Sequence, residues 1–385
     1  MSVTGPGGGA EEIVLRNASR IDPERFKMSI SVIRDIVDEQ FNFTDRARAL
    51  GIETYEVFQR GMLDRSVGKR LAEIVEAIKP RIIHAHGYKP VFHTWRLKRR
   101  HPIIPIATLH GWTGHTPRER FIYYPAERRL LRSFPRIVAV SEDLRETYLR
   151  SGGRAEQVTV LLNGVDPEDF DPQPGLRKNL RQQLDLGPNE IAICGVGRVE
   201  PQKRFDVLLE SMALLHNNQP KLRLFICGTG SKDEEIRACI QRLNLNETCA
   251  MLGHRADMRD LYHAFDMFVQ SSDYEGTPTV LVEAMACRLP IVATDVGGTT
   301  QLVRPDVDAL IVPRREPEKL AAAITRTIED QAATQQRVAA GRQRVETDLS
   351  FRSRLDRLTA IYDELLSRDD VTKSTAKVTS NARND

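Results

Sequence analysis

The 385-residue sequence has no long hydrophobic run and few cysteines. No stretch approaches the ~20 apolar residues that a membrane-spanning helix needs. The opening residues, MSVTGPGGGAEE, hold neither a basic run nor an apolar core, so no signal peptide is expected. The five cysteines are odd in number and form no C-x-x-C pair, which argues against a zinc site or a disulfide framework. We therefore expect a cytoplasmic protein with buried free thiols.

Net charge is also small, at +3, but its distribution is uneven. Residues 81–136 hold 12 basic and 2 acidic side chains. Such a cluster indicates an anionic partner, either a membrane surface or a phosphorylated acceptor. The alternative is a solvated face whose arginines are anchored by packing. A nucleic-acid partner is not expected, because no aromatic-interleaved platform or helix-turn-helix pattern accompanies the charge.

Short apolar runs alternate with amphipathic helical patterns, which predicts an α/β fold built from βαβ units. The length suits two domains better than one core. We predict strands at Met28–Ile33, Arg81–His86, Ile104–Leu109, Arg136–Val140, Val158–Leu162, Ile191–Gly195, Leu222–Cys227, Cys249–Leu252, Met267–Gln270, Ile291–Thr294 and Ala309–Val312.

The domain boundaries are expected where Asp, Pro and Gly gather. We assign a first domain, a linker, a second domain, a helix crossing back to the first domain and a disordered tail. Their ranges are 1–167, 168–189, 190–348, 349–366 and 367–385.

In GVGRVEPQKRF, residues 195–205, a predicted strand gives way to a helix. Arg198 and Lys203 stand at the carboxyl end of that strand, where open α/β sheets bind ligands. Two cations beside a helix N-terminus suit a diphosphate. A nicotinamide fingerprint fails because its third glycine is replaced by Glu200. The alternative is that both cations are ordinary surface charges.

The segment SSDYEGTPTVLVEA, residues 271–284, predicts a loop followed by a helix. Thr277 is expected to cap a helix whose first residue is Pro278. The backbone N–H groups of Thr279 and Val280 would then point at an anion.

Two carboxylates flank that helix start, Glu275 before it and Glu283 within it. Carboxylates bind paired hydroxyls well and repel phosphate, so we expect one to hold the sugar and the other the ribose. The alternative for Glu283 is a buried helix residue with a structural partner.

Taken together, GRxxxxK, EGxPxxxxEA and PIVATDVGG resemble the retaining glycosyltransferases of family 4, also called glycosyl transferases group 1. Glu275 and Glu283 match the family's carboxylate pair, with seven residues between them. The segments GPGGGAEE, HAHG, TLHGWTGH, VAVSEDLRE and NGVDPEDF also look like family segments in family order.

The resemblance implies the GT-B fold, two Rossmann-like domains with parallel sheets facing across a cleft. It implies that Glu275 holds the donor sugar and Glu283 the ribose, with Gly276 in the donor loop. Gly8 and Gly9 would let backbone approach the donor. The acceptor side would hold His110, Gly111 and Ser141, although His110 alone could equally be a structural histidine.

The activity implied is transfer of a sugar from a nucleotide-diphosphate sugar, with retention of configuration and without a metal or other cofactor. Departure of the diphosphate would be assisted by Arg198, Lys203 and the helix dipole. The catalytic set is therefore Glu275, His110, Arg198 and Lys203, and no side chain is assigned as nucleophile. UDP is the expected nucleotide, because uracil donors are commonest in such families. The acceptor is a sugar or a lipid-linked molecule in cell-surface polysaccharide or glycolipid synthesis, at the inner face of the membrane.

Two features depart from the family pattern. Only Ser2–Thr4 precede the glycine-rich segment, so the first strand is expected to be missing or shortened. Loss of this central strand would expose two strand edges, which motivates an alternative reading as a truncated, non-catalytic nucleotide- or membrane-binding relative. Arg288 stands where the family has glycine, which puts the following turn and the charge near the donor in doubt.

Two metal-like patterns are discounted. Asp306-x-Asp308 is expected to form a turn, downstream of the donor motifs. His84 and His86 share a strand face and could join His110, but no convergent carboxylate accompanies them.

Overall fold

The structure is a computed structural model that describes residues 1–4, 9–35, 42–60, 64–112, 117–216 and 221–381. The chain divides into two compact units, which are described separately below. Unit 1 comprises Met1–Leu161 and Leu355–Asp385, and unit 2 comprises Leu162–Arg354.

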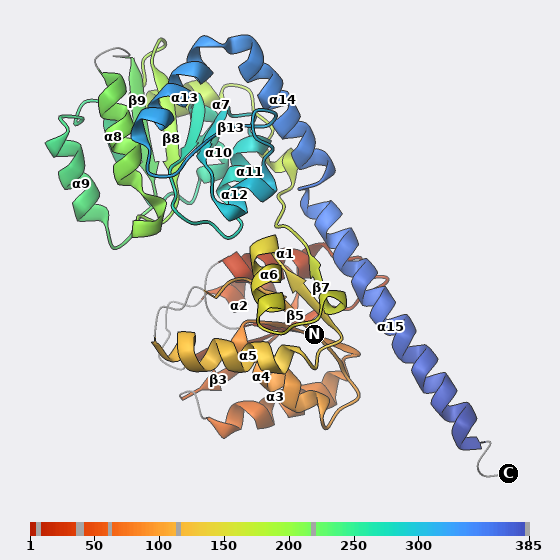
Figure 1. Ribbon diagram of the computed structural model, residues 1–385. Coiled ribbons are helices and arrows are strands. Elements are labelled where there is room, and N and C mark those ends of the chain that lie inside the picture. The colour runs from red at the N-terminus through yellow and green to blue at the C-terminus, as the bar shows by residue number, and fades with distance from the viewer. Residues whose placement is uncertain (5–8, 36–41, 61–63, 113–116, 217–220, 382–385) are drawn as a thin grey trace. The chain divides into compact units, whose positions relative to one another are not determined.

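Unit 1 is built on a parallel sheet of seven strands in the order β3-β2-β1-β4-β5-β6-β7 (Figure 1). Sequence order reverses between β1 and β4, which makes this the switch point where such sheets bind ligands. The strands are β1 (Ser2–Thr4), β2 (Ser29–Asp35), β3 (Glu53–Gln59), β4 (Ile82–His86), β5 (Ile104–Leu109), β6 (Arg136–Ala139) and β7 (Val158–Val160).

Helices cover both faces of this sheet, which is why its central strands are almost continuously buried. Leu71 of α3 and Leu97 of α4 pack on one face, and Val14 of α1 and Phe43 of α2 pack on the other. The helices are α1 (Gly9–Arg20), α2 (Phe43–Ala49), α3 (Arg65–Ile78), α4 (Tyr88–Lys98), the π-helix η1 (Glu119–Tyr123), α5 (Tyr124–Leu131), α6 (Glu142–Arg150) and the 3-10 turn η2 (Ala155–Gln157).

The first strand is shortened, as predicted, but it is present. β1 has three residues and lies at the centre of the sheet. Ser2 pairs with Ile30 of β2 on one side and with His84 of β4 on the other. Three residues are sufficient here because each forms ladder contacts with a long neighbouring strand, so the sheet is continuous across its centre.

Unit 2 has a six-stranded parallel sheet in the order β10-β9-β8-β11-β12-β13, with its switch point between β8 and β11. The strands are β8 (Ile191–Val196), β9 (Leu222–Cys227), β10 (Cys249–Gly253), β11 (Met267–Gln270), β12 (Ile291–Thr294) and β13 (Leu310–Val312). Both sheets therefore agree with the predicted Rossmann-like architecture.

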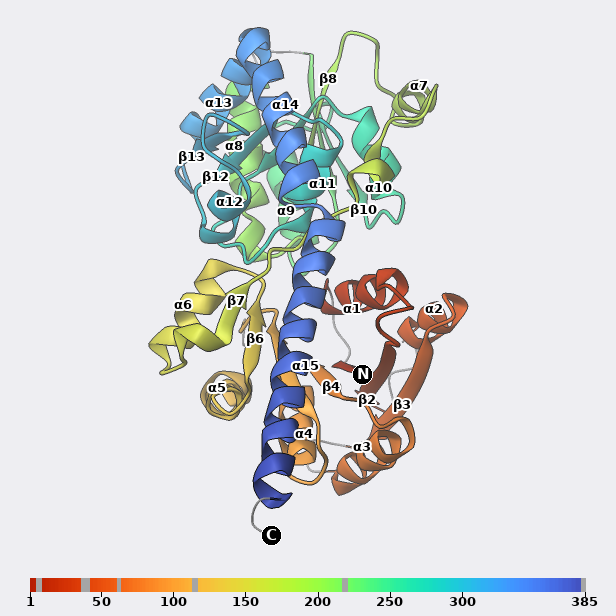
Figure 2. The same cartoon turned by 90° about the vertical axis from the view of Figure 1, so that its right-hand side faces the viewer.

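The helices of unit 2 also form two layers, visible in Figures 1 and 2. Apolar residues of α8, α9 and α13 pack on one face of the sheet, and those of α7, α11 and α14 on the other. The elements are η3 (Pro167–Phe170), α7 (Leu176–Gln183), η4 (Pro201–Lys203), α8 (Phe205–His216), α9 (Asp233–Arg242), α10 (Met258–Leu261), η5 (Tyr262–Ala264), α11 (Thr279–Ala286), α12 (Gly297–Leu302), α13 (Pro317–Glu329) and α14 (Gln331–Thr347).

The last helix, α15 (Phe351–Asn381), begins in unit 2, and from Leu355 onward it belongs to unit 1. Within unit 1, Tyr362 of this helix hydrogen-bonds His84 of β4 (Oη to Nδ1, 2.7 Å). Helical backbone continues to Asn381, past residue 367 where the sequence predicts a disordered tail. Arg81 pairs with Asp370, which gives the start of that segment a partner on unit 1.

Two expectations from composition can be compared with the described residues. Among them, no helix is long and apolar enough to cross a membrane. All five cysteines are free; four are buried and Cys287 is partly exposed. Burial raises the pKa of the Cys227 and Cys249 thiols to about 12, as expected for inert core thiols.

Candidate functional site

In unit 2, the predicted donor residues meet at the switch point of the sheet. Lys203 follows β8, and Glu275 follows β11, the strand that pairs with β8. Their side chains form an ion pair, with Lys203 Nζ 2.5 Å from Glu275 Oε1. Both are nearly buried, with 12% and 7% of their side chains exposed, so the pair is little screened by water.

Glu275 has a second partner in its own loop. Ser272 donates its hydroxyl to the same carboxylate oxygen, Oε1, at 2.6 Å. Within the described part of the chain, Oε2 accepts no hydrogen bond. One oxygen therefore holds the carboxylate in place, and the other is available to a ligand.

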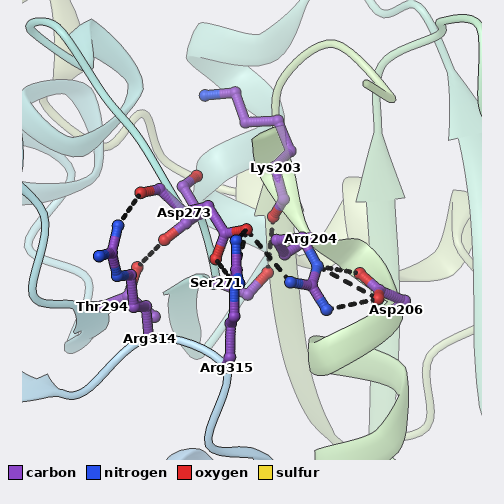
Figure 3. A network of polar contacts seen from close by, with 9 residues as sticks. Lys203, Arg204, Asp206, Ser271, Asp273, Thr294, Arg314 and Arg315 are labelled. Atoms are coloured by element: carbon purple, nitrogen blue, oxygen red, sulfur yellow. Dashed lines mark hydrogen bonds and ion pairs between the residues drawn. The ribbon is translucent and has the colours of Figure 1, made fainter. Parts of the chain in front are cut away.

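A network of charged side chains joins the loop that carries Lys203 to the loop that carries Glu275 (Figure 3). Arg204 lies between Asp206 and Asp273. It donates to both carboxylate oxygens of Asp206 and, through Nη1 at 3.1 Å, to Asp273 Oδ2. Arg315 approaches Asp273 from the other side with a two-point contact at 2.9 and 2.8 Å. The Arg315 guanidinium, followed by Arg204, lowers the pKa of Asp273, so this carboxylate stays charged.

Backbone contacts join the same loops. Asp273 N donates to Gln202 O at 2.8 Å, and Ser271 Oγ donates to Lys203 O at 2.9 Å. Arg204 itself has a φ of +49°, a left-handed conformation that costs a non-glycine residue about 1–2 kcal/mol. Its ion pairs with two aspartates offset this strain and fix the position of the preceding Lys203.

The helix after the Glu275 loop begins one residue later than predicted. Pro278 is the N-cap, α11 starts at Thr279, and Thr277 is not the cap. Proline has no N–H and no side-chain acceptor, so it leaves the first amides of the helix without a side-chain cap. Within the described residues, the N–H groups of Thr279 and Val280 carry no hydrogen bond. This is a helix N-terminus able to bind an anion.

Glu283 lies on α11 beyond this N-terminus and is half-buried. Tyr262, which is fully buried, donates its hydroxyl to Glu283 Oε2 at 3.0 Å. Burial, together with the Glu283 charge, raises the pKa of Tyr262 well above its ordinary value, so the phenol remains a donor. The structural partner considered for Glu283 is therefore present, and it orients the carboxylate.

Glycines allow the loops around the site to pack backbone against backbone. A Cβ on Gly298 would lie 1.9 Å from Gly276 O, and one on Gly228 would lie 1.9 Å from Gly197 O. A substitution at either position would push the loop that carries Glu275 or Arg198. Gly276, by contrast, has open space where a side chain would begin.

Arg198 differs from Lys203 in being exposed. No polar contact of its guanidinium is formed with any described residue, so its side chain is free to reach a ligand. Of the two side chains predicted to bind the diphosphate, Lys203 is therefore ion-paired, and Arg198 makes no polar contact with a described residue.

In unit 1, a cavity of about 300 Å³ opens at the carboxyl ends of β1, β4 and β5, again at the switch point. His110 lines it, and its Nε2 lies 2.9 Å from Nδ1 of the buried His86. Thr4 and Trp112 also line the cavity.

Opposite the histidines, α5 contributes Tyr124 and Glu127 to the same cavity. Glu127 is 5% exposed, and Trp112 donates Nε1–H to its Oε2 at 2.8 Å. Burial raises the pKa of this carboxyl from 4.5 to about 7, even though the Trp112 bond and Arg128 favour the charged form. The arrangement offers imidazole, phenol and carboxyl groups to a polyhydroxylated molecule.

Four other residues of unit 1 are predicted to lie on the donor or the acceptor side. Gly8 lies outside the described residues, and Gly9 begins α1. Gly111 lines the cavity with a φ of +146°, in the region that favours glycine. Ser141 is fully buried and caps α6, where its hydroxyl oxygen accepts from Leu144 N at 3.3 Å.

The discounted residues have structural partners. His84 is bonded at both ring nitrogens, to Tyr362 and to Thr108. Asp308 lies in the predicted turn and is bonded to Arg304 at 2.9 and 2.7 Å.

Arg288 lies just beyond the C-terminal end of α11, the end opposite Thr279, and its φ of +58° confirms a position suited to glycine. Its charge is therefore separated from the donor residues by the length of the helix, and it pairs with Asp171 at 3.3 Å.

Sequence reasoning missed three groups of side chains. Arg204 and Asp273 lie within two residues of predicted donor residues and Arg315 does not, so only the fold brings the three together. No feature of the sequence around Tyr262 marks it as a functional residue. Glu127 had one, because a carboxylate on the helical stripe that also carries Leu130 and Leu131 predicts a buried acid.

Two family models match the chain one after the other. The model described as Glycosyltransferase Family 4 matches residues 7–169, and the model described as Glycosyl transferases group 1 matches residues 177–344.

Individual relatives agree with these models. A D-inositol 3-phosphate glycosyltransferase of Thermomonospora curvata is 28% identical over 308 residues, covering 73% of this chain and 70% of the relative. The lipopolysaccharide core biosynthesis mannosyltransferase LpsB of Rhizobium meliloti is 24% identical over 361 residues, covering 87% and 99%.

Solved structures share the fold. Anabaena Alr3699/HepE in complex with UDP superposes with a TM-score of 0.82 at 21% identity, covering 94% of this chain and 99% of that one. The same protein in complex with UDP-glucose gives a TM-score of 0.79 at 22% identity, covering 94% and 100%. With two parallel Rossmann-like sheets and donor motifs at the switch point of the second, this chain belongs to the family 4, group 1 glycosyltransferases and has the GT-B fold.

Proposed function

We propose that this glycosyltransferase uses a nucleotide-diphosphate sugar, with UDP as the nucleotide, and transfers the sugar with retention of configuration. The observation that carries the proposal is the Lys203–Glu275 pair beside the uncapped N-terminus of α11. Cation, carboxylate and free amide groups at one switch point suit a ligand that joins a diphosphate to a polyhydroxylated ring. HepE, which shares the fold, is described in complex with UDP-glucose.

Each part of the donor has a proposed partner. The diphosphate is bound by Arg198, Lys203 and the amides of Thr279 and Val280. Lys203 has three N–H donors and can keep Glu275 while contacting phosphate oxygens. Glu275 Oε2 accepts from the donor sugar.

The ribose is assigned to Glu283. Its carboxylate can accept from two neighbouring hydroxyls while Tyr262 keeps one oxygen in place.

Catalysis is proposed to need no metal. The negative charge that develops on the leaving diphosphate is stabilised by Arg198, Lys203 and the α11 dipole. The donor phosphate takes the proton from the acceptor hydroxyl, and no side chain is assigned as nucleophile. His110, bonded to His86, contributes from the acceptor side and orients the attacking hydroxyl.

The acceptor is proposed to be a sugar or a lipid-linked molecule in polysaccharide or glycolipid synthesis, handled by a cytoplasmic enzyme at the membrane surface. The cavity at His110 supports this, because its imidazole, phenol and carboxyl groups suit hydroxyls. The relative LpsB is named for lipopolysaccharide core biosynthesis.

The alternative is a non-catalytic relative that binds a nucleotide without transferring a sugar. It was motivated by a missing first strand, and β1 is present and paired on both sides. The short strand still makes the alternative worth testing.

The test is thermal unfolding of the full chain with UDP, GDP, ADP and their sugar conjugates, without added metal. A ligand at about a hundred times its Kd stabilises the folded state by about 2.7 kcal/mol. We expect UDP and a UDP-sugar to raise Tm in the wild type and in Glu210→Ala, an exposed carboxylate on α8, and not in Glu283→Ala. Folded protein that responds to no nucleotide would refute the donor assignment, and UDP binding without turnover of any UDP-sugar would favour the non-catalytic alternative.

A further inference from the structure

The helical segment 117–131 of unit 1 has two faces of opposite character. Its inner face carries Glu127 and Leu131, which are buried, and Tyr124. The outer face is defined by the exposed residues Arg118, Phe121, Ile122, Pro125, Ala126 and Arg129. These positions are spaced three and one residues apart, so they form one continuous stripe along the helix.

The outer face is unusually apolar for an exposed surface. Phe121 is 71% exposed and Ile122 is 58% exposed. Phe92 of the neighbouring α4, 43% exposed, extends the apolar surface, because it shares a small cavity with Ala126 of the outer face. Contiguous apolar patches rimmed by polar residues commonly mark a binding surface.

The rim is cationic. Arg118 and Arg129 flank the apolar residues along the helix, and Arg120 lies over the Phe121 ring at 5.6 Å. In the part of the chain that the structure describes, none of these three arginines forms an ion pair. Arginines without carboxylate partners next to an apolar stripe leave the surface ready for a partner that is both anionic and apolar.

An anionic lipid bilayer has that chemistry. The aromatic and aliphatic side chains of an interfacial helix insert at the level of the headgroups while its arginines contact lipid phosphates. A nucleic acid would use the arginines but has no use for Ile122, Pro125 and Ala126. A protein partner could also meet an apolar centre rimmed by arginines, and the experiment below distinguishes it from a bilayer.

We propose that the outer face of η1–α5 docks this glycosyltransferase on an anionic membrane. The inner face of the same helix lines the His110 cavity with Tyr124 and Glu127. When the outer face docks on a membrane, a lipid-linked acceptor therefore lies near the inner face and its cavity. This consequence rests on the proposed function.

The experiment is co-sedimentation of the full chain with phosphatidylcholine vesicles, with and without phosphatidylglycerol. We expect the wild type to bind the anionic vesicles preferentially. Phe121→Ser with Ile122→Ser should lower the partition coefficient by at least about tenfold, because two large apolar side chains no longer insert. Arg118→Ser with Arg129→Ser should lower it by about fivefold per charge at low salt and by less at high salt.

Two matched controls separate this surface from general effects. Arg65→Ser with Arg70→Ser removes two exposed charges from α3 of the same unit, and Leu214→Ser removes an exposed leucine (49% exposed) from α8. Both should bind vesicles like the wild type. Cooperative thermal unfolding without ligand, at a Tm close to that of the wild type, reports for every variant that the protein is folded.

The outcomes distinguish this inference from the proposed function. Equal vesicle binding by the outer-face variants, or no binding by a wild type that responds to UDP, overturns the docking surface alone. A wild-type dimer that dissociates on Phe121→Ser with Ile122→Ser and ignores vesicles shows a protein interface instead. Vesicle binding without any nucleotide response supports docking and refutes the donor assignment.

Discussion

The two units place polar groups at the switch points of similar sheets, but the two sites differ in how many of these groups are ion-paired. In unit 2, the site consists of ionised groups bound to one another, from Lys203–Glu275 to Arg204–Asp273–Arg315. In unit 1, the corresponding cavity is lined mostly by imidazole, indole and phenol groups, together with Lys89 and Glu119, and Glu127, its buried carboxyl, has a raised pKa. The first arrangement suits a charged diphosphate, and the second suits an uncharged hydroxyl.

This difference also predicts how the units respond to mutation. A network of buried ion pairs loses most when one partner is removed, because the remaining charge is left unsolvated. A site lined mostly by uncharged groups loses less on substitution, and the raised pKa of its buried carboxyl makes it change with pH. The predictions below test this contrast, from the largest effect to the smallest.

The largest effect is expected at Glu275. Glu275→Gln keeps an acceptor for Ser272 but removes the charge that Lys203 pairs with and the carboxylate proposed to hold the sugar. We expect kcat for transfer from a UDP-sugar to fall by about 10²–10³-fold, and the free energy of unfolding to fall by about 3 kcal/mol. Steady-state kinetics and urea unfolding measure the two effects.

A second variant separates fold from function. Lys203→Met combined with Glu275→Gln removes both charges and should recover most of the stability, because no unpaired ion remains buried. Activity should stay low. Recovery of activity together with stability would show that the pair is structural only.

The neutral carboxyl of unit 1 should make stability depend on pH. The pKa of Glu127 is about 7 in the folded state and 4.5 ordinarily, so between these values the unfolded chain releases a proton that the folded chain keeps. This carboxyl therefore favours folding less as pH rises from 4.5 to 7, with a total change of up to about 3 kcal/mol.

Glu127→Gln should remove this component. Urea unfolding at pH 5 and pH 8 should show a smaller decrease for the variant than for the wild type. In a Trp95→Phe background, Trp112 fluorescence should titrate near pH 7 when Glu127 is present and should not do so in the Glu127→Gln variant. A Trp112 signal that does not change between pH 5 and 8 would show that Glu127 is not held neutral.

Next, the network behind the donor pair can be broken without touching a proposed ligand. Asp273→Asn removes the charge shared by Arg204 and Arg315, and Arg204 loses one of the two partners that offset its left-handed backbone. We expect the free energy of unfolding to fall by about 2 kcal/mol. The donor KM should rise, because the Lys203 loop is less well held.

Arg315→Ala is the comparison for Asp273→Asn. It leaves Arg204 bonded to both aspartates, and its own side chain is 63% exposed. Its effect should therefore be less than about 1 kcal/mol. Equal losses in the two variants would contradict a central role for Asp273.

A smaller effect is expected at Tyr262. Tyr262→Phe removes one hydrogen bond to Glu283 and preserves the buried ring. The donor KM should rise by about tenfold with little change in kcat, since a hydrogen bond to a charged group contributes at least about 1.5 kcal/mol. A uniform fall in kcat with no change in KM would argue against positioning of Glu283.

The smallest effect is a gain. Arg288→Gly relieves a left-handed residue at φ +58° and sacrifices an ion pair with Asp171 whose partners are 46% and 50% exposed. Exposed pairs contribute little, and the added freedom of glycine in the unfolded chain offsets part of the gain. We expect an increase of about 0.5 kcal/mol in unfolding free energy, with unchanged kinetics. A decrease would show that the Asp171 contact outweighs the strain.

Most strands could be predicted from sequence because they are buried on both faces. Ile104–Leu109, Leu222–Cys227, Met267–Gln270 and Ile291–Thr294 were predicted with their observed bounds. β3 (Glu53–Gln59) was missed because it lies at the edge of its sheet, where an exposed face replaces the apolar run with ETYEVFQ. The start of α11 was wrong by one residue, because a Thr–Pro pair allows either residue to be the cap.

The sequence by itself determined the family, the two-domain α/β architecture and the donor motifs, since each depends on residue types at short spacings. Only the tertiary structure decided which side chains meet. Lys203 and Glu275 are 72 residues apart and meet because the parallel strands β8 and β11 end at one edge of the sheet. Tyr262 and Glu283 are 21 residues apart and meet because the element before β11 and the helix after it pack together. Burial decided the rest: the same glutamate side chain is a salt-bridged ligand candidate at position 275 and an acid with a raised pKa at position 127, because neighbours and solvent access set its charge.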